Sequence, residues 1–390
     1  MENVNEEMAY VEKLIEQLKH DDLTQRVAAS NQIARISRAL GPERTREELI
    51  PFIIDSTDDE DEFLQSIALN LKDFSPLVGG VQFSYIIFEV FEVLAAVEDN
   101  WVRDAVVNSI EFILQSFNEE NILEIFVPFL KNLALNDWFT TRITAANLFH
   151  IIYKKLPIND QKVARSIFFG LCYDAVPLVR RVAACNLSKL VPELSPVDIK
   201  TELLEPLLRL STDEQDSVRI QCCTNCAVIS SFLPIELKLA KILPIISSLS
   251  SDKSWRVRWS LANNIHKIYS DIGSEFTKES LISIFESLLL DYEAEVRSEA
   301  LLNIPKIVIY IKKDVLLNNF VPCLNRLVSD PSEFVRYSLG GVIADIAGAL
   351  GKDDTINFLL PLLLLLLRDE NSDVIAKYYQ FYELVLQYKS

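Results

Sequence analysis

Apolar positions along the chain follow helical spacing in pairs of segments that are separated by a short polar turn. Within Phe320–Val328 the apolar residues recur three and four positions apart, and Leu339, Val342, Ile343 and Ile346 do the same after the turn. One helix pair of this kind cannot bury both of its faces, so neighbouring pairs must stack on one another. The pattern predicts an all-α fold of stacked helix pairs, an α-α superhelix.

The pairs repeat with a period of 38 or 39 residues. In Asp291–Arg297 an arginine follows an aspartate by six residues, and the same spacing returns in Asp213–Arg219, Asp252–Arg258 and Asp330–Arg336. The arginine register runs through Arg26, Gln65, Arg103, Arg142, Arg180, Arg219, Arg258, Arg297, Arg336 and Ile375. The aspartate register holds Asp59, Asp174, Asp213, Asp252, Asp291, Asp330 and Asp369, and departs from aspartate at His20, Val97 and Asn136.

This register predicts a single solenoid of about ten two-helix repeats over residues 1–390. The approximate repeats are 8–44, 45–82, 83–120, 121–159, 160–198, 199–237, 238–276, 277–315, 316–354 and 355–390.

Two further landmarks recur in the same phase. Fourteen residues before the arginine position stand Pro51, Pro128, Pro244, Pro322 and Pro361, with Pro206 one residue out of step. Since proline removes a helical hydrogen bond, these positions predict a bend in the first helix of each pair. Glycine and threonine follow the arginine position as Gly41 and Thr45, Gly273 and Thr277, Gly351 and Thr355. We expect the glycine to cap one helix in the left-handed conformation and the threonine to cap the next helix.

The repeated aspartate and arginine are interpreted first as scaffold. The aspartate can cap the second helix or accept from turn amides, and the arginine can reach an aspartate of an adjacent turn. A residue that returns in every unit belongs to the shared structure, so functional residues are sought among the turn positions that differ.

Composition and charge exclude several classes of protein. Only 9 glycines occur in 390 residues, which argues against glycine-rich phosphate loops. With 56 acidic against 38 basic residues, a formal charge of -18 disfavours binding to nucleic acid. The apolar run Phe358–Leu367 contains Pro361 and has half of the ~20 residues that a membrane span needs, so we expect a buried helix and no membrane partner. No leader pattern opens the chain, and the six cysteines suggest a reduced, intracellular protein.

Candidate chemistry is sparse. His20, His150 and His266 lie in different repeats, so no nucleophile–base arrangement can be built from them. Cys222, Cys223 and Cys226 share a helix face but have no fourth metal ligand nearby, so we expect buried apolar side chains. The acidic run 55–62 lacks the ligand spacing of a calcium loop and is interpreted as a solvated turn. The sequence therefore predicts no catalytic residue, no metal and no cofactor, and a protein that is not an enzyme.

Three of the four tryptophans, Trp101, Trp138 and Trp255, fall in the turns inside the repeats. Tryptophan and arginine are the residue types most often found as anchors of protein interfaces. In a two-helix solenoid these turns form a row, which favours partner binding; the alternative is that the aromatic side chains fill gaps between repeats. In Ser251–Trp259 only 253–256 differ from the shared pattern, and Trp259 is left without a role.

The units resemble HEAT repeats, and several strings resemble turns of the scaffold-subunit family of type 2A serine/threonine protein phosphatase. The strings that carry the resemblance are RALGPERTREELIPF (Arg38–Phe52), DWFTTR (Asp137–Arg142), PLVRRVAA (Pro177–Ala184), DEQDSVR (Asp213–Arg219), DKSWRVR (Asp252–Arg258) and DYEAEVR (Asp291–Arg297).

This resemblance implies a non-catalytic scaffold that holds the phosphatase catalytic subunit next to a B-type regulatory subunit. In the family, regulatory subunits dock on the turns of the amino-terminal repeats. Carried over to this sequence, the implied binding residues are Glu98, Asp99, Trp101, Asp137, Trp138, Phe139, Pro177, Arg180, Arg181, Asp213, Gln215, Asp216, Ser217, Ser254, Trp255 and Arg256. Where the family commonly has a second acid before the proline of the fifth repeat, this chain has Ala175.

The family has about fifteen repeats and seats its catalytic subunit on the last of them, whereas this chain stops after the tenth. We therefore expect either a fragment or a naturally short homologue whose catalytic-subunit contacts are lost or relocated. The resemblance also implies a cytoplasmic protein, with the nucleus as a second compartment.

A second hypothesis is a HEAT-repeat transport receptor or adaptor whose acidic surface binds a basic cargo protein. A scaffold should bind a phosphatase regulatory subunit through the tryptophan turns, whereas a transport receptor should respond to a small GTPase.

Overall fold

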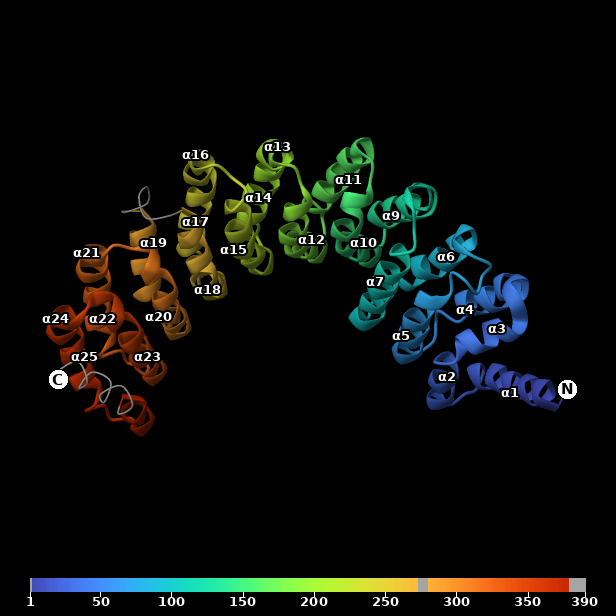
Figure 1. The fold of residues 1–390 in the computed structure, drawn as a ribbon, viewed down its shortest axis with the longest axis horizontal. Helices are drawn as coiled ribbons and strands as arrows, with labels where there is room; N and C mark the ends of the chain where they lie inside the picture. Colours follow the sequence, from blue (N-terminus) through green and yellow to red (C-terminus); the bar gives the residue numbers. More distant parts are fainter. Residues whose placement is uncertain (1, 273–279, 379–390) are drawn as a thin grey trace. The chain divides into compact units, whose positions relative to one another are not determined.

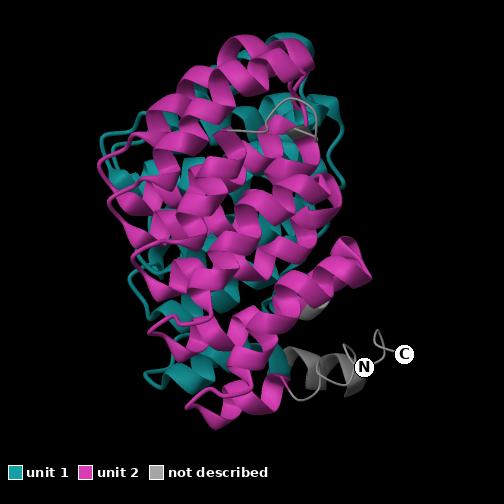
Figure 2. Ribbon diagram, turned by 90° about the vertical axis from the view of Figure 1, so that its left-hand side faces the viewer, with its two compact units in different colours: residues 1–193 teal, residues 194–390 magenta. Residues whose placement is uncertain are grey.

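The structure is a computed structural model that describes residues 2–272 and 280–378. Helices and turns make up these ranges, and no strand occurs in them. The chain divides into two compact units, Met1–Glu193 and Leu194–Ser390, coloured separately in Figure 2. Both units are built from helix pairs, which confirms the predicted all-α class. The single solenoid over 1–390 and its exact repeat limits stay predictions.

In the first unit each pair has a first and a second helix. The first helices are α1 (Glu2–Leu18), α4 (Ile50–Asp55), α6 (Tyr85–Leu94), α8 (Glu119–Asn121) continued by α9 (Val127–Ala134), and α11 (Ile158–Leu171). The second helices are α2 (Leu23–Ser30) with α3 (Ile33–Arg44), α5 (Asp61–Asn70), α7 (Asn100–Leu114), α10 (Phe139–Ile152) and α12 (Pro177–Leu190).

The second unit follows the same order. Its first helices are α13 (Pro196–Asp198) with α14 (Leu204–Ser211), α16 (Ile235–Leu237) with α17 (Leu243–Ser250), α19 (Ser280–Leu289), α21 (Lys313–Val315) with α22 (Val321–Leu327), and α24 (Lys352–Asp354) with α25 (Leu360–Leu366). Its second helices are α15 (Asp216–Ser230), α18 (Trp255–Ile272), α20 (Ala294–Ile307), α23 (Glu333–Leu350) and the helical residues 372–378. Short 3-10 turns lie at Leu71–Asp73, Val81–Phe83, Tyr153–Lys155, Val191–Glu193 and Val308–Tyr310.

Each unit has two layers of helices with the core between them (Figure 1). In the first unit α5, α7, α10 and α12 contact one another in succession, and α4, α6, α9 and α11 form the other layer. In the second unit α15, α18, α20 and α23 form one layer, and α14, α17 and α19 lie in the other. Helices α14 and α15 of the two layers contact each other, and Leu207 and Leu210 of α14 and Val218 and Ile229 of α15 are all fully buried. Helical spacing of apolar residues thus produces a core that runs between the layers.

The predicted bend in the first helices is a widening of the helix to π geometry. Six π segments lie in the described residues: Thr45–Leu49, Ile122–Phe126, Ile199–Leu203, Lys238–Ile242, Leu316–Phe320 and Thr355–Leu359. Each is followed within two or three positions by one of the recurring prolines. In five of them the residue just before the proline donates its N–H to the carbonyl five residues earlier, as Ile50 does to Thr45. Proline has no N–H and its ring collides with the carbonyl four residues back, so the wider turn relieves both problems.

The glycine landmark is confirmed at the two described positions, where Gly41 and Gly351 have φ of 82° and 81°. The threonine prediction is wrong. Thr45 Oγ1 donates to the Ser37 carbonyl at 3.2 Å, and Thr355 Oγ1 donates to the Ala347 carbonyl at 3.0 Å. The next helix begins directly after the glycine, so the threonine already lies inside it and faces back onto the preceding helix. Gly273 and Thr277 lie outside the described residues.

The apolar run 358–367 is helical but buries only one face. Leu362, Leu363 and Leu366 are buried, whereas Leu364 and Leu365 are exposed. The expectation of a buried helix is therefore correct for one side, because the helix lies in an outer layer. Throughout the described ranges, every helix is too short or too polar to cross a bilayer.

Candidate protein-interaction surface

Five turns inside the repeats, those that begin at Asp174, Asp213, Asp252, Asp291 and Asp330, are closed by the same hydrogen bonds. At 252–258 the carboxylate of Asp252 accepts from the N–H of Ser254 at 2.8 Å, and Arg258 Nη1 donates to the Asp252 carbonyl at 2.7 Å. Asp174, Asp213, Asp291, Asp330 and Asp369 accept from the residue two positions on in the same way. The aspartate holds the start of the turn and the arginine ties its carbonyls to the second helix, so the tip residues between them are presented outward.

The same arginine and aspartate also join neighbouring repeats. Arg258 donates from Nε and Nη2 to the two carboxylate oxygens of Asp291, at 2.6 and 2.8 Å. Equivalent pairs are Arg142–Asp174, Arg219–Asp252, Arg297–Asp330 and Arg336–Asp369, and Arg26 reaches Asp59 through Nη2 alone. The two-pronged geometry matches a guanidinium to a carboxylate, and the pairs are largely buried. We call this series the Arg–Asp ladder; it confirms the scaffold interpretation of both residues.

Hydrogen bonds of the ladder lower the pKa of Asp252 and Asp369. The Arg336 guanidinium, which donates to Asp369, lowers the pKa of that carboxyl. Burial of Asp252 acts to raise its pKa, but the hydrogen bonds from Arg219 and the Ser254 N–H outweigh burial, and the pKa is lowered. These carboxyls are therefore ionised across the physiological range.

The ladder is interrupted in the first unit. Gln65 replaces one arginine, and Asn136 stands where Arg103 would find its aspartate. Arg103 donates instead to the carbonyls of Val97 and Glu98, at 2.5 and 2.7 Å, and to Asn100 within its own turn. Its Nε is buried without a hydrogen-bond partner, and burial lowers the pKa of its guanidinium. Among the described turns, this one holds a ladder arginine without a carboxylate from the next repeat.

The predicted binding residues of the first unit include its most exposed aromatic side chains. Trp101 is 70% exposed and Trp138 is 64% exposed, while Phe139 is half-buried. Asp99 caps α7 by accepting from the N–H groups of Trp101 and Val102, at 2.7 and 3.0 Å. A rigid cap thus fixes the backbone beneath the indole of Trp101.

The remaining candidates of the first unit differ in character. Glu98 and Asp137 are exposed on the same two turns. Pro177 is the first residue of α12, where its missing N–H costs nothing. Arg180 donates to the carbonyls of Asp174 and Ala175, at 2.8 and 3.2 Å, so it belongs to the repeated turn, whereas Arg181 is exposed.

In the second unit the candidates lie on two adjacent turns that are bonded to each other. Ser254 Oγ donates to Asp216 Oδ2 at 2.8 Å, which ties the turn before α18 to the start of α15. Trp255 is half-buried, and the Arg256 guanidinium lies 5.0 Å from the centre of its ring. Gln215 is exposed, Ser217 is half-buried, and Asp213 accepts from the Gln215 N–H. Trp255 is thus less exposed than Trp101 and Trp138, and half-burial alone does not separate partner binding from gap filling for this residue.

Sequence reasoning missed the two most exposed aromatic residues in the described part of the second unit. Tyr292 is 97% exposed and Phe334 is 72% exposed, each on a turn after the last predicted candidate. The signal was present, because Phe334 and Trp101 both stand two residues before the ladder arginine.

The groups considered for chemistry are structural. Cys222, Cys223 and Cys226 are buried in α15, and burial raises the pKa of Cys223 to about 12. His150 is partly buried, and burial, followed by the charge of Lys189, lowers its pKa to about 4. In the acidic run, Asp59 and Glu60 bond to Arg26, so this turn is part of the ladder rather than fully solvated. Within the described residues no group of acidic, histidine and cysteine side chains is arranged to hold a metal ion.

A family model and a set of curated proteins both show similarity to the A-type regulatory subunits of protein phosphatase 2A. A family model described as a PPP2R1A-like HEAT repeat matches residues 274–351. The A-type regulatory subunit of protein phosphatase PP2A from Schizosaccharomyces pombe is 39% identical over 220 residues, which is 56% of this chain and 37% of that protein. The alpha isoform of the 65 kDa A-type regulatory subunit of phosphatase 2A from Arabidopsis thaliana is 38% identical over 204 residues, covering 52% of this chain and 35% of its own length. The chain thus spans less than two fifths of these curated relatives.

Solved structures show the same fold. Kap121p bound to Pho4p superposes on 96% of this chain with a TM-score of 0.69 at 16% sequence identity, and 41% of that protein is covered. At this identity the likeness is one of architecture. The resemblance expected from the sequence is confirmed: the chain has the fold of a HEAT-repeat protein and is related, over about half of its length, to the A-type regulatory subunits of protein phosphatase 2A.

Proposed function

We propose that the chain is a non-catalytic scaffold or regulatory subunit of a type 2A protein phosphatase complex. The observation that carries this proposal is the 37–40% identity to curated proteins named as regulatory or scaffold subunits of this phosphatase. In this role the chain binds a B-type regulatory subunit on its intra-repeat turns and acts in the cytoplasm and the nucleus. Binding of the catalytic subunit belongs to the later repeats of the longer relatives, or to a relocated surface.

The turn geometry supports the choice of surface. Trp101 and Trp138 lie on neighbouring turns and are mostly exposed, and side-chain oxygens of Asp99 and Asn136 accept from their backbone N–H groups. Large exposed indoles on a preorganised surface gain free energy when a partner covers them, and little ordering of the surface opposes binding. Glu98 and Asp137 add negative charge beside them.

The test is binding of a purified B-type regulatory subunit to the full chain, measured by biolayer interferometry. We expect Trp101→Ala and Trp138→Ala each to weaken binding about tenfold or more. Trp255→Ala combined with Arg256→Glu should also weaken it, through the second unit. Ile158→Ala removes another exposed apolar side chain, outside these turns, and should leave binding unchanged.

Affinity purification of the chain from its own cells tests the complex as a whole. Recovery of a regulatory subunit or catalytic subunit of the phosphatase is the expected result. If regulatory subunits bind wild type and all tryptophan variants equally while circular dichroism shows intact helices, the proposed surface is wrong. If no regulatory subunit binds at all, the scaffold role itself is wrong.

The alternative is a transport receptor or adaptor for a basic cargo protein. The acidic charge favours it, while the likeness to Kap121p supports the fold alone. Release of a bound partner by a GTP-loaded small GTPase would favour this alternative over the scaffold.

A further inference from the structure

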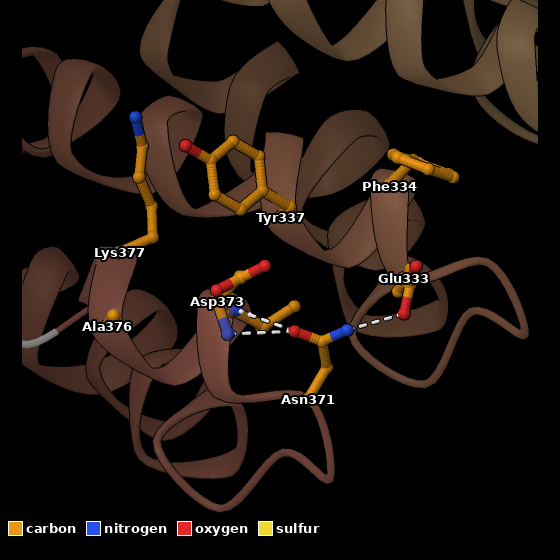
Figure 3. A pocket seen from close by; sticks show the side chains of 8 residues that line it. Glu333, Phe334, Tyr337, Asn371, Asp373, Ala376 and Lys377 are labelled. Atoms are coloured by element: carbon orange, nitrogen blue, oxygen red, sulfur yellow. Dashed lines mark hydrogen bonds between the residues drawn. The ribbon is translucent and has the colours of Figure 1, made fainter.

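A groove opens between the last two described turns of the second unit, well beyond the predicted binding residues. Glu333, Phe334 and Tyr337 of α23 form one wall, and Asn371, Asp373 and Lys377 of the following helical segment form the other (Figure 3). Its volume is about 540 Å³. This is enough space for a long side chain together with part of its backbone.

Hydrogen bonds fix the floor of the groove. Asn371 Nδ2 donates to Glu333 Oε2, and Asn371 Oδ1 accepts from the N–H groups of Asp373 and Val374, at 2.8 and 3.3 Å (Figure 3). Beneath it, Asp369 is paired with Arg336 through the ladder. The two walls therefore keep their spacing without a ligand, which lowers the entropic cost of binding one.

One aromatic ring of the groove already has a cation next to it. The Lys377 ammonium lies 5.0 Å from the centre of the Tyr337 ring. Phe334 presents a second ring, most of which is exposed, beside the carboxylate of Glu333. An aromatic face next to a carboxylate suits a planar guanidinium, which can stack on the ring and donate to the oxygens at once.

Charge favours the same occupant. Two carboxylates and one ammonium line the groove, and the ammonium is placed over Tyr337. Glu293, Glu295 and Glu370 are exposed on the turns at 291–297 and 369–371, in a chain of formal charge -18. A positively charged segment is therefore drawn toward this end of the unit, while an acidic one is repelled.

We propose that this groove binds an arginine-containing basic segment of a partner protein, with a guanidinium stacked on Phe334 and paired with Glu333. The site goes beyond the scaffold role above, because it uses none of the residues assigned to the regulatory subunit. It gives the second unit its own contact to a partner.

The probe is a fluorescein-labelled peptide of alternating arginine and glycine, titrated with the full chain and followed by fluorescence anisotropy. We expect Phe334→Ala to weaken binding roughly fivefold to tenfold, and Phe334→Trp to retain it. Glu333→Gln, which can still accept from Asn371, should weaken binding and reduce its dependence on salt. A lysine–glycine peptide of equal length and charge should bind more weakly than the arginine peptide, since an ammonium group cannot form the bidentate pair that a guanidinium forms with a carboxylate.

Trp101→Ala is the matched control, because this ring occupies the equivalent turn position in the first unit. It should leave the peptide affinity unchanged and weaken the binding of the regulatory subunit, while Phe334→Ala should do the reverse. Equal binding of the arginine peptide to wild type and Phe334→Ala, with helicity intact, would overturn the groove whatever happens to the regulatory subunit. Loss of regulatory-subunit binding in Phe334→Ala would also overturn it as a separate site. Failure of Trp101→Ala to affect the regulatory subunit would count only against the proposed function.

Discussion

Each ladder aspartate accepts hydrogen bonds from two repeats at the same time. Asp291 takes the guanidinium of Arg258 from the repeat before and the N–H of Glu293 from its own turn. The same residue therefore closes a turn and fixes the distance to its neighbour. Removing one member of such a buried pair leaves a charge without a partner, which is the costly case for ion pairs.

The missing carboxylate opposite Arg103 allows the stability contribution of one Arg–Asp pair to be measured. Asn136→Asp keeps the acceptor for the Trp138 N–H and adds the missing carboxylate opposite Arg103. We expect the variant to be more stable by about 1 kcal/mol, measured as a shift of the urea unfolding midpoint. Asn136→Ser keeps a short acceptor without charge and serves as its control.

The gain must also depend on the arginine. In the background of Arg103→Gln, Asn136→Asp should give no stabilisation, since no guanidinium remains to pair with it. A gain that persists there would mean that the aspartate acts on the turn alone.

His150 should make stability depend on pH above the range in which carboxyls titrate. Burial lowers its pKa from 6.5 to about 4, so between these values the unfolded chain binds a proton that the folded chain does not. Stability is therefore full above pH 6.5 and falls as the pH drops toward 4. Urea midpoints at about pH 7.5 and about pH 5 should differ less in His150→Gln than in wild type. An equal difference in both proteins would rule out His150 as a source of the loss.

At the scale of the helix, one glycine of this chain adopts a backbone conformation that favours glycine, and another lies inside a helix where alanine is preferred. Gly41 has a φ of 82°, which a residue with a side chain reaches only at a cost, although no atom lies within 4 Å of an added Cβ. Gly170 lies inside α11, is exposed, and also has open space around an added Cβ. The two positions thus separate backbone strain from steric conflict.

We expect Gly41→Ala to destabilise the protein by about 1–2 kcal/mol and Gly170→Ala to stabilise it by about 0.5–1 kcal/mol. Thermal unfolding followed by circular dichroism measures both. Changes of the same sign in the two variants would show that the backbone conformation at Gly41 is not the deciding factor.

The sequence predicts the turns and the bonds between repeats better than it predicts the form of the first helices. The Asp–Arg spacing predicted the turns and the bonds between repeats, because side-chain chemistry at a fixed spacing leaves few partners. The recurring proline predicted a disturbed helix, yet not its form, because a kink and a π turn both relieve the collision of the ring with the carbonyl. Thr45 was assigned to the wrong helix end, since its partner lies eight residues back across the turn at Gly41.

For the candidate surface, the sequence predicted that the tryptophans lie in the turns, but it could not predict how exposed each side chain is. Trp101, Trp138 and Trp255 share the turn, yet only the first two are mostly exposed, whereas Trp255 is half-buried. Exposure depends on the size of the side chains on the adjacent turn, which the period alone does not give. In the last repeat, Tyr378 is buried and packs against Gly340.

At the scale of each unit, helix pairs contact the pairs next to them. A local defect should therefore spread to the neighbouring pairs and no further. We expect Asp291→Asn, which breaks the pair with Arg258, to speed hydrogen exchange in α18 and α20 by about tenfold or more. Exchange in α5, α7 and α10 of the first unit should stay as in wild type. A uniform increase over the whole chain would mean that the repeats unfold as one cooperative body.

The π segments have a consequence for reading relatives of this chain. A turn that closes on the fifth residue holds one residue more than an α turn, so the side chains after it are rotated by about 100° relative to a continuous α-helix. A helical wheel that assumes 100° per residue through Thr45–Leu49 and α4 therefore places the buried residues of the two segments on different sides. The apolar face of each segment is then not recognised in the plot. In a homologue that lacks the proline, a single-residue gap belongs inside this helix rather than in a loop. Removing one residue together with the proline should return this turn to α geometry and leave the buried stripe of each half facing the core.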